Sequence, residues 1–215
     1  MKIQILISKG SWANKYKEKI TRSLKKFSDN IIFFDDHKKL KKGFDINIIF
    51  SYFSKIPKKY LFYSKNNLVP HESQLPKGKG MSPLTWQIIE KKNKIYFSLI
   101  EASKKIDGGS IYYQKPVKFK KDLLFQEIKE IQLLENLKLI KKFIIHLKNK
   151  KEIPCFIKKN GTGSFYRKRT PLDSELNINR SLKSQFNLLR ISDYNNYPAF
   201  FKIFGKKYKI KISRL

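Results

Sequence analysis

Two segments of the chain combine residue types that can do acid–base chemistry. The first, residues 71–87, begins with His71 and continues as a loop rich in proline, glycine and backbone amides. The second, residues 104–114, contains Asp107 in a turn with two glycines, followed by an apolar stretch. A histidine held near a carboxylate is suited to act as a general base or to stabilise an oxyanion near neutral pH. We therefore expect His71 and Asp107 to be catalytic partners; the alternatives are an ordinary packing histidine and a simple turn.

The elements that must position these two residues alternate along the chain. Apolar runs predict strands, and apolar residues at helical spacing predict helices. We expect strands over 2–7, 30–35, 45–50, 61–64, 95–101 and 110–114, and helices over 14–27, 84–89 and 122–148, the last capped by Asp122. This alternation is typical of an α/β fold with a mainly parallel sheet, which binds ligands beyond the carboxyl ends of its strands. The loop over 70–83 lies at such an end.

A smaller second unit follows the α/β part. We divide the chain into a domain over 1–150 and a short C-terminal subdomain over 151–215. In the latter, 182–189 predicts a short helix, and 197–204 and 208–212 predict a β-hairpin. A unit of this size is too short to hold a core alone, so we expect it to pack on the first domain.

Charge is the unusual feature of the composition. The chain carries 48 lysines and arginines against 17 acidic residues, a net charge of +31. Lysines occur in nearly every segment, which favours a solvated surface over a nucleic-acid footprint gathered in one stripe. Guanidinium groups can bind phosphate or carboxylate in a bidentate manner. Five of the six arginines lie in the last quarter of the chain: Arg167, Arg169, Arg180, Arg190 and Arg214.

Several classes of protein are excluded or disfavoured by pattern. No apolar run approaches the roughly 18 to 20 residues of a membrane span, and the N-terminus turns polar too soon for a signal peptide. The single cysteine, Cys155, cannot form an internal disulfide and is interpreted as an apolar filler. Neither a dinucleotide-binding nor a Walker glycine motif is present. We expect a cytoplasmic protein with no metal site and no membrane partner.

The combined motifs resemble those of the folate-dependent formyltransferases, the methionyl-tRNA formyltransferase-like family. The matching residues are His71, then Ser73-Gln74-Leu75-Pro76, Lys79-Gly80-Met81-Ser82-Pro83, and Asp107-Gly108-Gly109. The separation of the histidine and the aspartate, 107 − 71 = 36, also fits. The resemblance implies a Rossmann-like domain that binds N10-formyltetrahydrofolate and passes its formyl group to a primary amine.

The resemblance also implies roles for individual residues. His71 would act as base or donate to the oxyanion, and Asp107 would orient it. The family's asparagine two residues before the histidine is Val69 here, and Asn67 is the nearest amide that could replace it. Residues expected to hold the folate are Ser73, Gln74, Leu75, Pro76, Lys79, Gly80 and Trp86.

The amine acceptor is predicted from the C-terminal segment. Residues 167–177 and 186–201 look like the segment that follows the catalytic domain in sugar-nucleotide N-formyltransferases, which implies a nucleotide-linked amino sugar, a role in lipopolysaccharide biosynthesis, and a homodimer formed through the hairpin. Residues expected to bind that acceptor are Arg167, Arg169, Tyr166 and Tyr197. Three alternatives stay open: a methionyl-tRNA formyltransferase-like enzyme, an RNA-binding protein, and a degenerate binder without catalysis.

Overall fold

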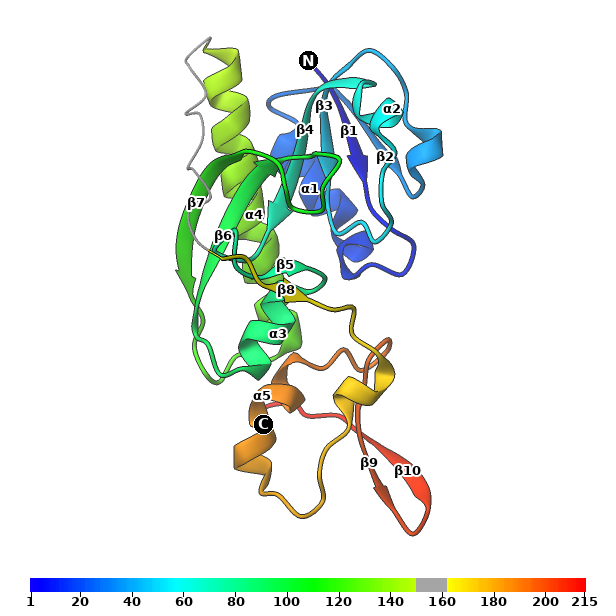
Figure 1. Cartoon of the computed structure of the whole chain (residues 1–215), viewed down its shortest axis with the longest axis vertical. Coiled ribbons are helices and arrows are strands. Elements are labelled where there is room, and N and C mark those ends of the chain that lie inside the picture. Colours follow the sequence, from blue (N-terminus) through cyan, green and yellow to red (C-terminus); the bar gives the residue numbers. More distant parts are fainter. Residues whose placement is uncertain (150–161) are drawn as a thin grey trace.

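The computed structural model describes residues 1–149 and 162–215 (Figure 1). Cys155 and the expected boundary between residues 150 and 151 lie outside the described residues. The α/β domain contains, in chain order, β1 (Lys2–Leu6), η1 (Trp12–Tyr16), α1 (Lys17–Leu24), β2 (Asn30–Phe34), η2 (His37–Lys39), β3 (Phe44–Ile49), α2 (Lys58–Leu61), β4 (Ser64–His71), β5 (Lys79–Gly80), α3 (Pro83–Ile89), β6 (Lys94–Glu101), β7 (Ile111–Lys118) and α4 (Phe125–Lys148).

The central sheet has six strands in the order β2-β1-β3-β4-β6-β7. Strands β1 to β4 pair in parallel, and β6 runs antiparallel to both of its neighbours, β4 and β7. The long helix α4 packs against β4, β6 and β7 and also contacts α1. Strands β1 and β3 have apolar sequences and are mostly buried, as expected for parallel strands that are covered on both faces of the sheet. The predicted α/β fold with a mainly parallel sheet is confirmed.

Strand β4 differs from the sequence prediction. Residues 61–64 are not a separate strand: they span the end of α2, the turn after it and the first residue of β4. The strand itself has the polar sequence SKNNLVPH, which can be buried because its amides find partners. The side chain of Asn66 donates to the Asp45 carbonyl at 3.1 Å, and that of Asn67 to the Leu61 carbonyl at 2.8 Å. The strand ends at His71.

Helix α4 begins three residues later than predicted. The Glu127 carboxylate accepts a hydrogen bond from the backbone N–H of Leu124 at 2.8 Å and so closes the first turn. Asp122 forms an ion pair with Arg214 at 3.4 Å instead. The prediction that Asp122 caps this helix is therefore wrong. No helix in the described part of the chain has the length and apolar character needed to cross a membrane.

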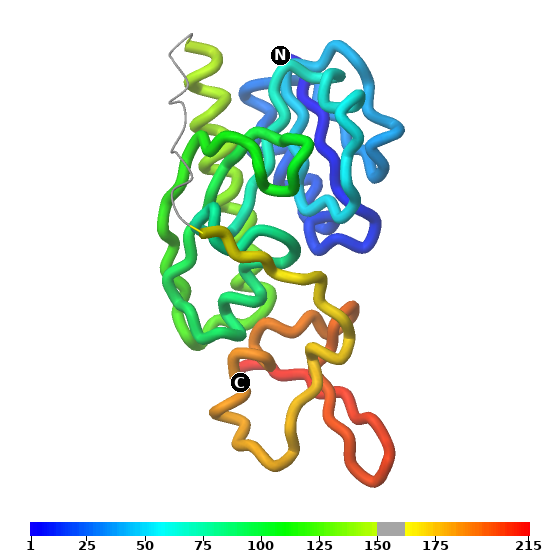
Figure 2. The backbone as a smooth tube through the Cα atoms, in the orientation of Figure 1, coloured from blue at the N-terminus to red at the C-terminus, as the bar shows by residue number. Residues whose placement is uncertain are grey.

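The C-terminal unit lies beyond the carboxyl ends of β1, β3 and β4 (Figures 1 and 2). Its helix α5 contacts α3 and α4. A small apolar cluster holds the unit together, formed by Leu176, Leu189 and Ala199. Its elements are β8 (Phe165–Tyr166), η3 (Pro171–Ser174), α5 (Leu182–Ile191), and a hairpin of β9 (Ala199–Ile203) and β10 (Lys206–Ile210).

Candidate active site

His71 is buried at the carboxyl end of β4, with 5% of its surface exposed. Its Nε2 atom lies 2.8 Å from the carbonyl oxygen of Gly78, in the loop that follows the strand. Because a carbonyl oxygen can only accept, Nε2 carries the proton in this contact. The other ring nitrogen, Nδ1, lies 3.6 Å from Oδ1 of Asp107. The imidazole is therefore held between a loop carbonyl and a carboxylate.

Asp107 reaches His71 from the loop between β6 and β7. Its second carboxylate oxygen accepts a hydrogen bond from the backbone N–H of Gly80 at 2.8 Å. The loop can adopt this path because Gly109 lies against the carbonyl oxygen of Glu101, where a Cβ atom would approach to 1.7 Å. The second glycine of the Asp107-Gly-Gly sequence is thus required by close backbone packing.

The residues expected to hold the folate occupy the loop after His71 and the helix that follows it. Leu75 packs against Val69, Ile100 and Ile111 in a small apolar cluster. Pro76 is half-buried and Gln74 is exposed. Ser73 is buried, and its carbonyl oxygen accepts a hydrogen bond from Ser98.

Three further residues of that set contact the C-terminal unit. Lys79 and Gly80 form β5, which pairs with β8. Trp86, in α3, donates from its indole to the carbonyl oxygen of Arg167 at 2.9 Å. The loop therefore contacts the sheet on one side and the C-terminal unit on the other.

Asn67 lies four residues before His71 on the same face of β4. Its amide nitrogen donates to the Leu61 carbonyl at 2.8 Å, and its amide oxygen accepts from Asn47 at 3.1 Å. Both polar atoms of the side chain are thus engaged within the protein. The position nearer to His71 on that face is Val69, which is apolar.

The four residues expected to bind the acceptor make contacts within the protein. Arg167 forms a two-contact ion pair with Asp173, one contact being 2.8 Å long, and this pair holds the pKa of Asp173 at about 2. Arg169 is buried and donates to Ser174 at 2.9 Å, with its guanidinium over the ring of Tyr197. Tyr166 donates to Glu90 at 2.8 Å and stacks on Trp86.

A half-buried carboxyl group that the sequence did not single out is bonded to the backbone of Asn67. Glu101, at the end of β6, accepts hydrogen bonds from the Asn67 backbone at 3.0 Å and from the Tyr112 hydroxyl at 2.6 Å. Burial raises the pKa of Glu101, and the two hydrogen bonds oppose that shift. Its position in an apolar strand gave no signal in the sequence beyond the charge itself.

A buried lysine is the second feature that the sequence did not reveal. Lys129 of α4 is 6% exposed, and its ammonium group lies 4.9 Å from the centre of the Trp12 ring. It donates to Gln132 at 2.8 Å. Desolvation lowers the pKa of Lys129 from 10.5 to about 8, although the negative charges of Glu72 and Asp193 raise it in part.

Glu72 directly follows His71 and connects Lys129 to the end of β4. Its carboxylate accepts a hydrogen bond from Asn136 of α4 at 2.6 Å. Its backbone carbonyl accepts one from Gln87 of α3 at 2.6 Å. The strand end that carries His71 is thus fixed to two helices through the next residue.

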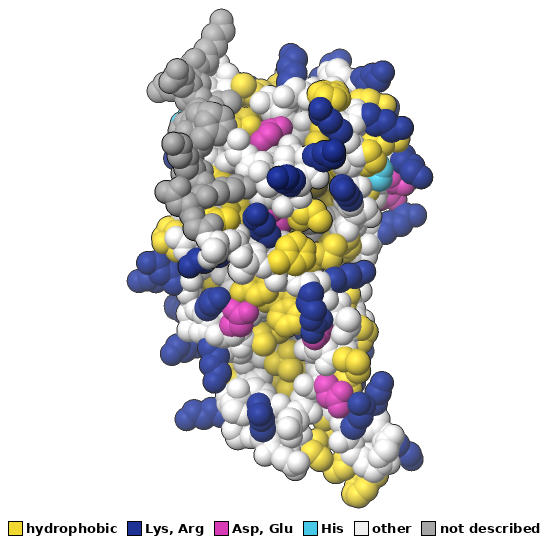
Figure 3. All heavy atoms as spheres, viewed as in Figure 1, with side chains coloured by type: hydrophobic (Ala, Val, Ile, Leu, Met, Phe, Trp, Pro, Cys, Tyr) yellow, Lys and Arg dark blue, Asp and Glu magenta, His cyan; other side chains and the backbone are white. Residues whose placement is uncertain are grey.

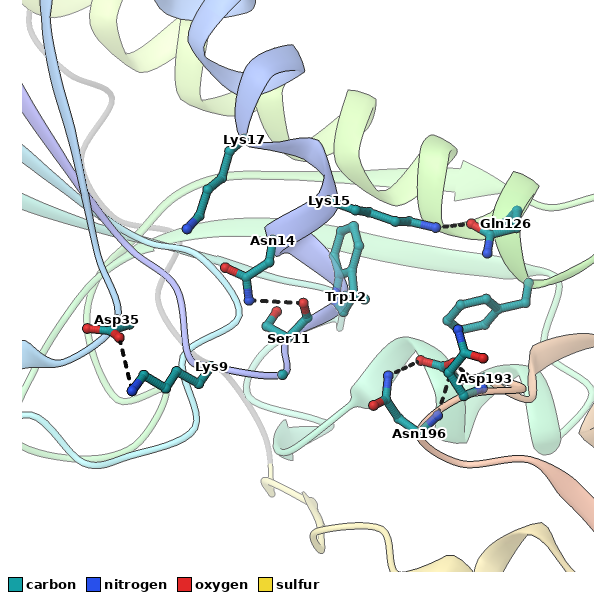
Figure 4. A pocket seen from close by; sticks show the side chains of 13 residues that line it. Lys9, Ser11, Trp12, Asn14, Lys15, Lys17, Asp35, Gln126, Asp193 and Asn196 are labelled. Carbon is teal, nitrogen blue, oxygen red and sulfur yellow. Dashed lines mark hydrogen bonds and ion pairs between the residues drawn. The ribbon is translucent and has the colours of Figure 1, made fainter.

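A cavity of about 530 Å³ opens between the η1 segment, the start of α4 and the C-terminal unit (Figure 4). Its wall is polar, with three lysines and two aspartates beside several amides and two aromatic rings. Lys9 pairs with Asp35 at 3.7 Å, and Asn196 donates to Asp193 at 2.8 Å. The lining residues are Lys9, Gly10, Ser11, Trp12, Asn14, Lys15, Lys17, Asp35, Phe125, Gln126, Asp193, Asn195 and Asn196.

The cavity and His71 belong to the same edge of the sheet. The cavity begins at the loop after β1, and His71 ends β4, two strands away in the parallel part of the sheet. Trp12 lines the cavity and also contacts Lys129. The charge of Lys129 interacts with Glu72, the residue after His71. Arg167, Arg169, Tyr166 and Tyr197 are not among the described residues that line this cavity.

Sequence comparison relates the chain to formyltransferases, although no family model matches it. It is 34% identical over 211 residues to the bifunctional polymyxin resistance protein ArnA of Wigglesworthia glossinidia brevipalpis, which covers 92% of this chain and 30% of ArnA. It is 32% identical over 108 residues to methionyl-tRNA formyltransferase of Coprothermobacter proteolyticus, covering 50% of this chain and 36% of that protein. The chain thus spans about a third of the length of these relatives.

Solved structures show the same fold. Methionyl-tRNA formyltransferase from Clostridium thermocellum superimposes with a TM-score of 0.77 at 20% identity, covering 100% of this chain and 94% of that one. The formyltransferase PseJ from Anoxybacillus kamchatkensis, in complex with UDP-4,6-dideoxy-4-formamido-L-AltNAc and tetrahydrofolate, gives a TM-score of 0.60 at 20% identity, covering 78% of this chain and 86% of PseJ. The resemblance to the formyltransferases that the motifs predict is confirmed.

Proposed function

We propose that this chain is an N-formyltransferase that moves a formyl group from N10-formyltetrahydrofolate to the primary amine of a nucleotide-linked amino sugar. One observation carries the proposal: the buried pair of His71 and Asp107 lies at the carboxyl edge of a formyltransferase fold, on the same edge as a polar cavity. Imidazole and carboxylate in contact supply the acid–base groups that amine acylation needs.

The proposed reaction balances with one proton acceptor. The amine nitrogen attacks the formyl carbon, a tetrahedral oxyanion forms, and the bond between that carbon and N10 breaks. His71 takes the proton that the amine loses and returns it to N10. Asp107, 3.6 Å from Nδ1, favours the positive charge that the ring then carries. For this role Nε2 keeps its proton and its contact with the Gly78 carbonyl, so Nδ1, beside Asp107, is the ring nitrogen that accepts the proton.

Local chemistry supports a folate donor at the loop after His71. Leu75, in the loop after His71, packs with Val69 and Ile100 in an apolar cluster, and the loop also contains backbone N–H and C=O groups. A flat ring with a polar edge needs both kinds of contact. The same fold holds tetrahydrofolate in the PseJ complex. The oxyanion donor at the family's asparagine position is missing at Val69, so we propose that a backbone N–H of this loop supplies one.

The cavity supports a nucleotide-linked acceptor. Its volume of about 530 Å³ lies in the range of small-molecule sites. Lys9, Lys15 and Lys17 can neutralise a diphosphate, and Trp12 offers a ring against which a base can stack. PseJ, which has this fold, binds a UDP-linked sugar. Arg167 and Arg169 are not among the described residues that line the cavity, so we assign the acceptor to the cavity rather than to these arginines.

Methionyl-tRNA is the second candidate acceptor, because several of the similar proteins are methionyl-tRNA formyltransferases. An RNA interface would gather its cations, whereas the lysines and arginines on the face seen in Figure 3 are spread from one end of the molecule to the other. This distribution favours the sugar nucleotide, and it also argues against a general RNA-binding protein.

We further propose the cellular setting and the assembly. A formylated sugar nucleotide is a precursor for cell-surface glycans such as lipopolysaccharide, which places the reaction in the cytoplasm. The C-terminal unit, residues 151–215, would form a homodimer through its hairpin, where Phe204 is 90% exposed and Tyr208 42% exposed. Exposed apolar side chains on a hairpin are suited to bury one another in a symmetric dimer.

Release of tetrahydrofolate tests the proposal. Wild-type protein is mixed with N10-formyltetrahydrofolate and, separately, with a panel of nucleotide-linked amino sugars and with methionyl-tRNA. We expect turnover with a sugar nucleotide, its loss in His71→Gln, and its retention in His146→Gln, a matched control on α4. Turnover with methionyl-tRNA alone would mean that the acceptor is methionyl-tRNA and not a sugar nucleotide. Binding of the folate and of a sugar nucleotide without turnover would mean that the protein is a degenerate binder without catalysis.

A further inference from the structure

A short segment of the C-terminal unit is bonded to the loop that carries the contacts of His71. We call residues 163–167 the strap; it includes β8, which pairs in parallel with β5 (Figure 1). The backbone N–H of Lys79 donates to the Ser164 carbonyl at 2.9 Å, and that of Met81 to the Tyr166 carbonyl at 3.0 Å. The strap thus extends the loop into a two-stranded ladder.

Gly78 joins the strap to His71 directly. Its carbonyl oxygen lies 2.8 Å from Nε2 of His71, and its N–H donates to the Ser164 hydroxyl at 2.8 Å. Its φ of +72° suits glycine, and an added Cβ would lie 2.9 Å from Cβ of Ser73 and 3.1 Å from the Tyr166 ring. The carbonyl shares its peptide plane with the N–H of Lys79, which the Ser164 carbonyl holds, so Ser164 binds both of the peptide units that meet at Gly78, one through its backbone and the other through its hydroxyl.

Gly80 makes the equivalent connection to Asp107. Its N–H donates to the carboxylate at 2.8 Å. It lies so close to the strap that a Cβ atom would approach the Tyr166 carbonyl oxygen to 2.2 Å. Both members of the catalytic pair are thus bonded to glycines of one loop, and the strap packs on both glycines.

We propose that Ser164 is a positioning residue for His71. Its hydroxyl fixes Gly78, and the Gly78 carbonyl then holds the proton on Nε2 and directs Nδ1 towards Asp107. The inference rests on the proposed function, in which His71 handles the proton. It gives the C-terminal unit a direct part in the active site. This role is additional to the proposed sugar-nucleotide acceptor and to the proposed homodimer.

The test compares Ser164→Ala with Ser164→Thr, which keeps the hydroxyl, and with Ser184→Ala, which removes an exposed hydroxyl from α5. Two readouts are needed: formyl-transfer kinetics and the ¹⁵N resonances of the histidine rings, which report the tautomer. The His71 resonances are assigned by their loss in His71→Gln, and His37 and His146 serve as internal references.

In Ser164→Ala we expect kcat to fall by about tenfold or more, with KM for both substrates changed by no more than about twofold. The His71 resonances should move towards a mixture of tautomers, while those of His37 and His146 stay in place. Ser164→Thr should restore both readouts, and Ser184→Ala should leave both unchanged.

The two readouts separate the inference from the proposed function. Unchanged His71 resonances in Ser164→Ala overturn the positioning role, whether or not kcat falls. Altered resonances in a protein that transfers no formyl group to any acceptor overturn the proposed function and leave the positioning of the histidine established. A matching loss of folding in Ser164→Ala and Ser164→Thr would identify the strap as structural only and would also overturn the inference.

Discussion

Replacing Lys129 by methionine should make the protein more stable at pH 7. The ammonium group is buried against Trp12 and Phe125, and its pKa is lowered from 10.5 to about 8. That value already includes the favourable charge of Glu72. A pKa difference of about 2.5, at about 1.4 kcal/mol for each unit, puts the cost of keeping Lys129 charged at about 3.5 kcal/mol. Methionine has a similar length and packs well against aromatic rings.

The sign of the pH dependence follows from the two pKa values. Below pH 8 the lysine is protonated in both states, so the full cost is present in the folded protein. Between about pH 8 and 10.5 the unfolded chain binds more protons than the folded one, and wild-type stability rises with pH. The advantage of Lys129→Met should therefore be at most about 3.5 kcal/mol at pH 7 and should approach zero near pH 10.5.

Urea unfolding at pH 7, 9 and 10.5, followed by circular dichroism, measures this difference between the variant and the wild type. Lys142→Met is the matched control, since Lys142 is exposed on the same helix, and its effect should stay within about 0.5 kcal/mol. A less stable Lys129→Met at pH 7, or a difference that does not change with pH, would refute the reasoning. A difference that does not change with pH would mean that Glu72 and Asp193 fully offset the desolvation of the ammonium group, and a less stable variant would mean that the contacts of Lys129 outweigh that desolvation.

Two further substitutions test the packing around the site. Gly80→Ala brings a Cβ to within 2.2 Å of the Tyr166 carbonyl and should lower kcat by about 100-fold, whereas Gly43→Ala, at a similar φ with nothing within 4 Å, should keep wild-type kinetics. Arg190→Met removes a fully buried guanidinium that donates to four acceptors, and should lower the unfolding free energy by about 2–4 kcal/mol in urea titrations; an equal effect of the exposed Arg180→Met would contradict this.

The sequence predicted the sheet and the contact between His71 and Asp107 because both have strong local signals. Continuous apolar runs identify β1, β2 and β3, and the apolar spacing over 122–148 identifies α4. The loop after His71 and the turn at Asp107 carry enough glycine and proline to be recognised. Strand β4 lacked such a signal because its polar residues are buried through tertiary hydrogen bonds, such as that from Asn67 to Leu61.

The arginines show why binding residues are harder to predict. A guanidinium group fits a carboxylate of its own chain as well as a phosphate of a ligand. Arg167 is paired with Asp173, and Arg190 with backbone carbonyls, which the sequence alone could not distinguish from free groups. The sequence also did not predict the strap, because β5 and β8 are two residues each and their pairing depends on tertiary contacts.

The pairing of the strap with the loop has a consequence for the order in which the protein folds. The hydrogen bond from Gly78 to Ser164 joins residues separated by 86 positions, whereas the parallel strands pair over shorter distances along the chain. Contacts of such long range form late, since the intervening chain must first be ordered. During synthesis the sheet can assemble before Ser164 emerges from the ribosome. A nascent chain can therefore form its sheet first and complete the contacts of the loop after His71 only when Ser164 has been made.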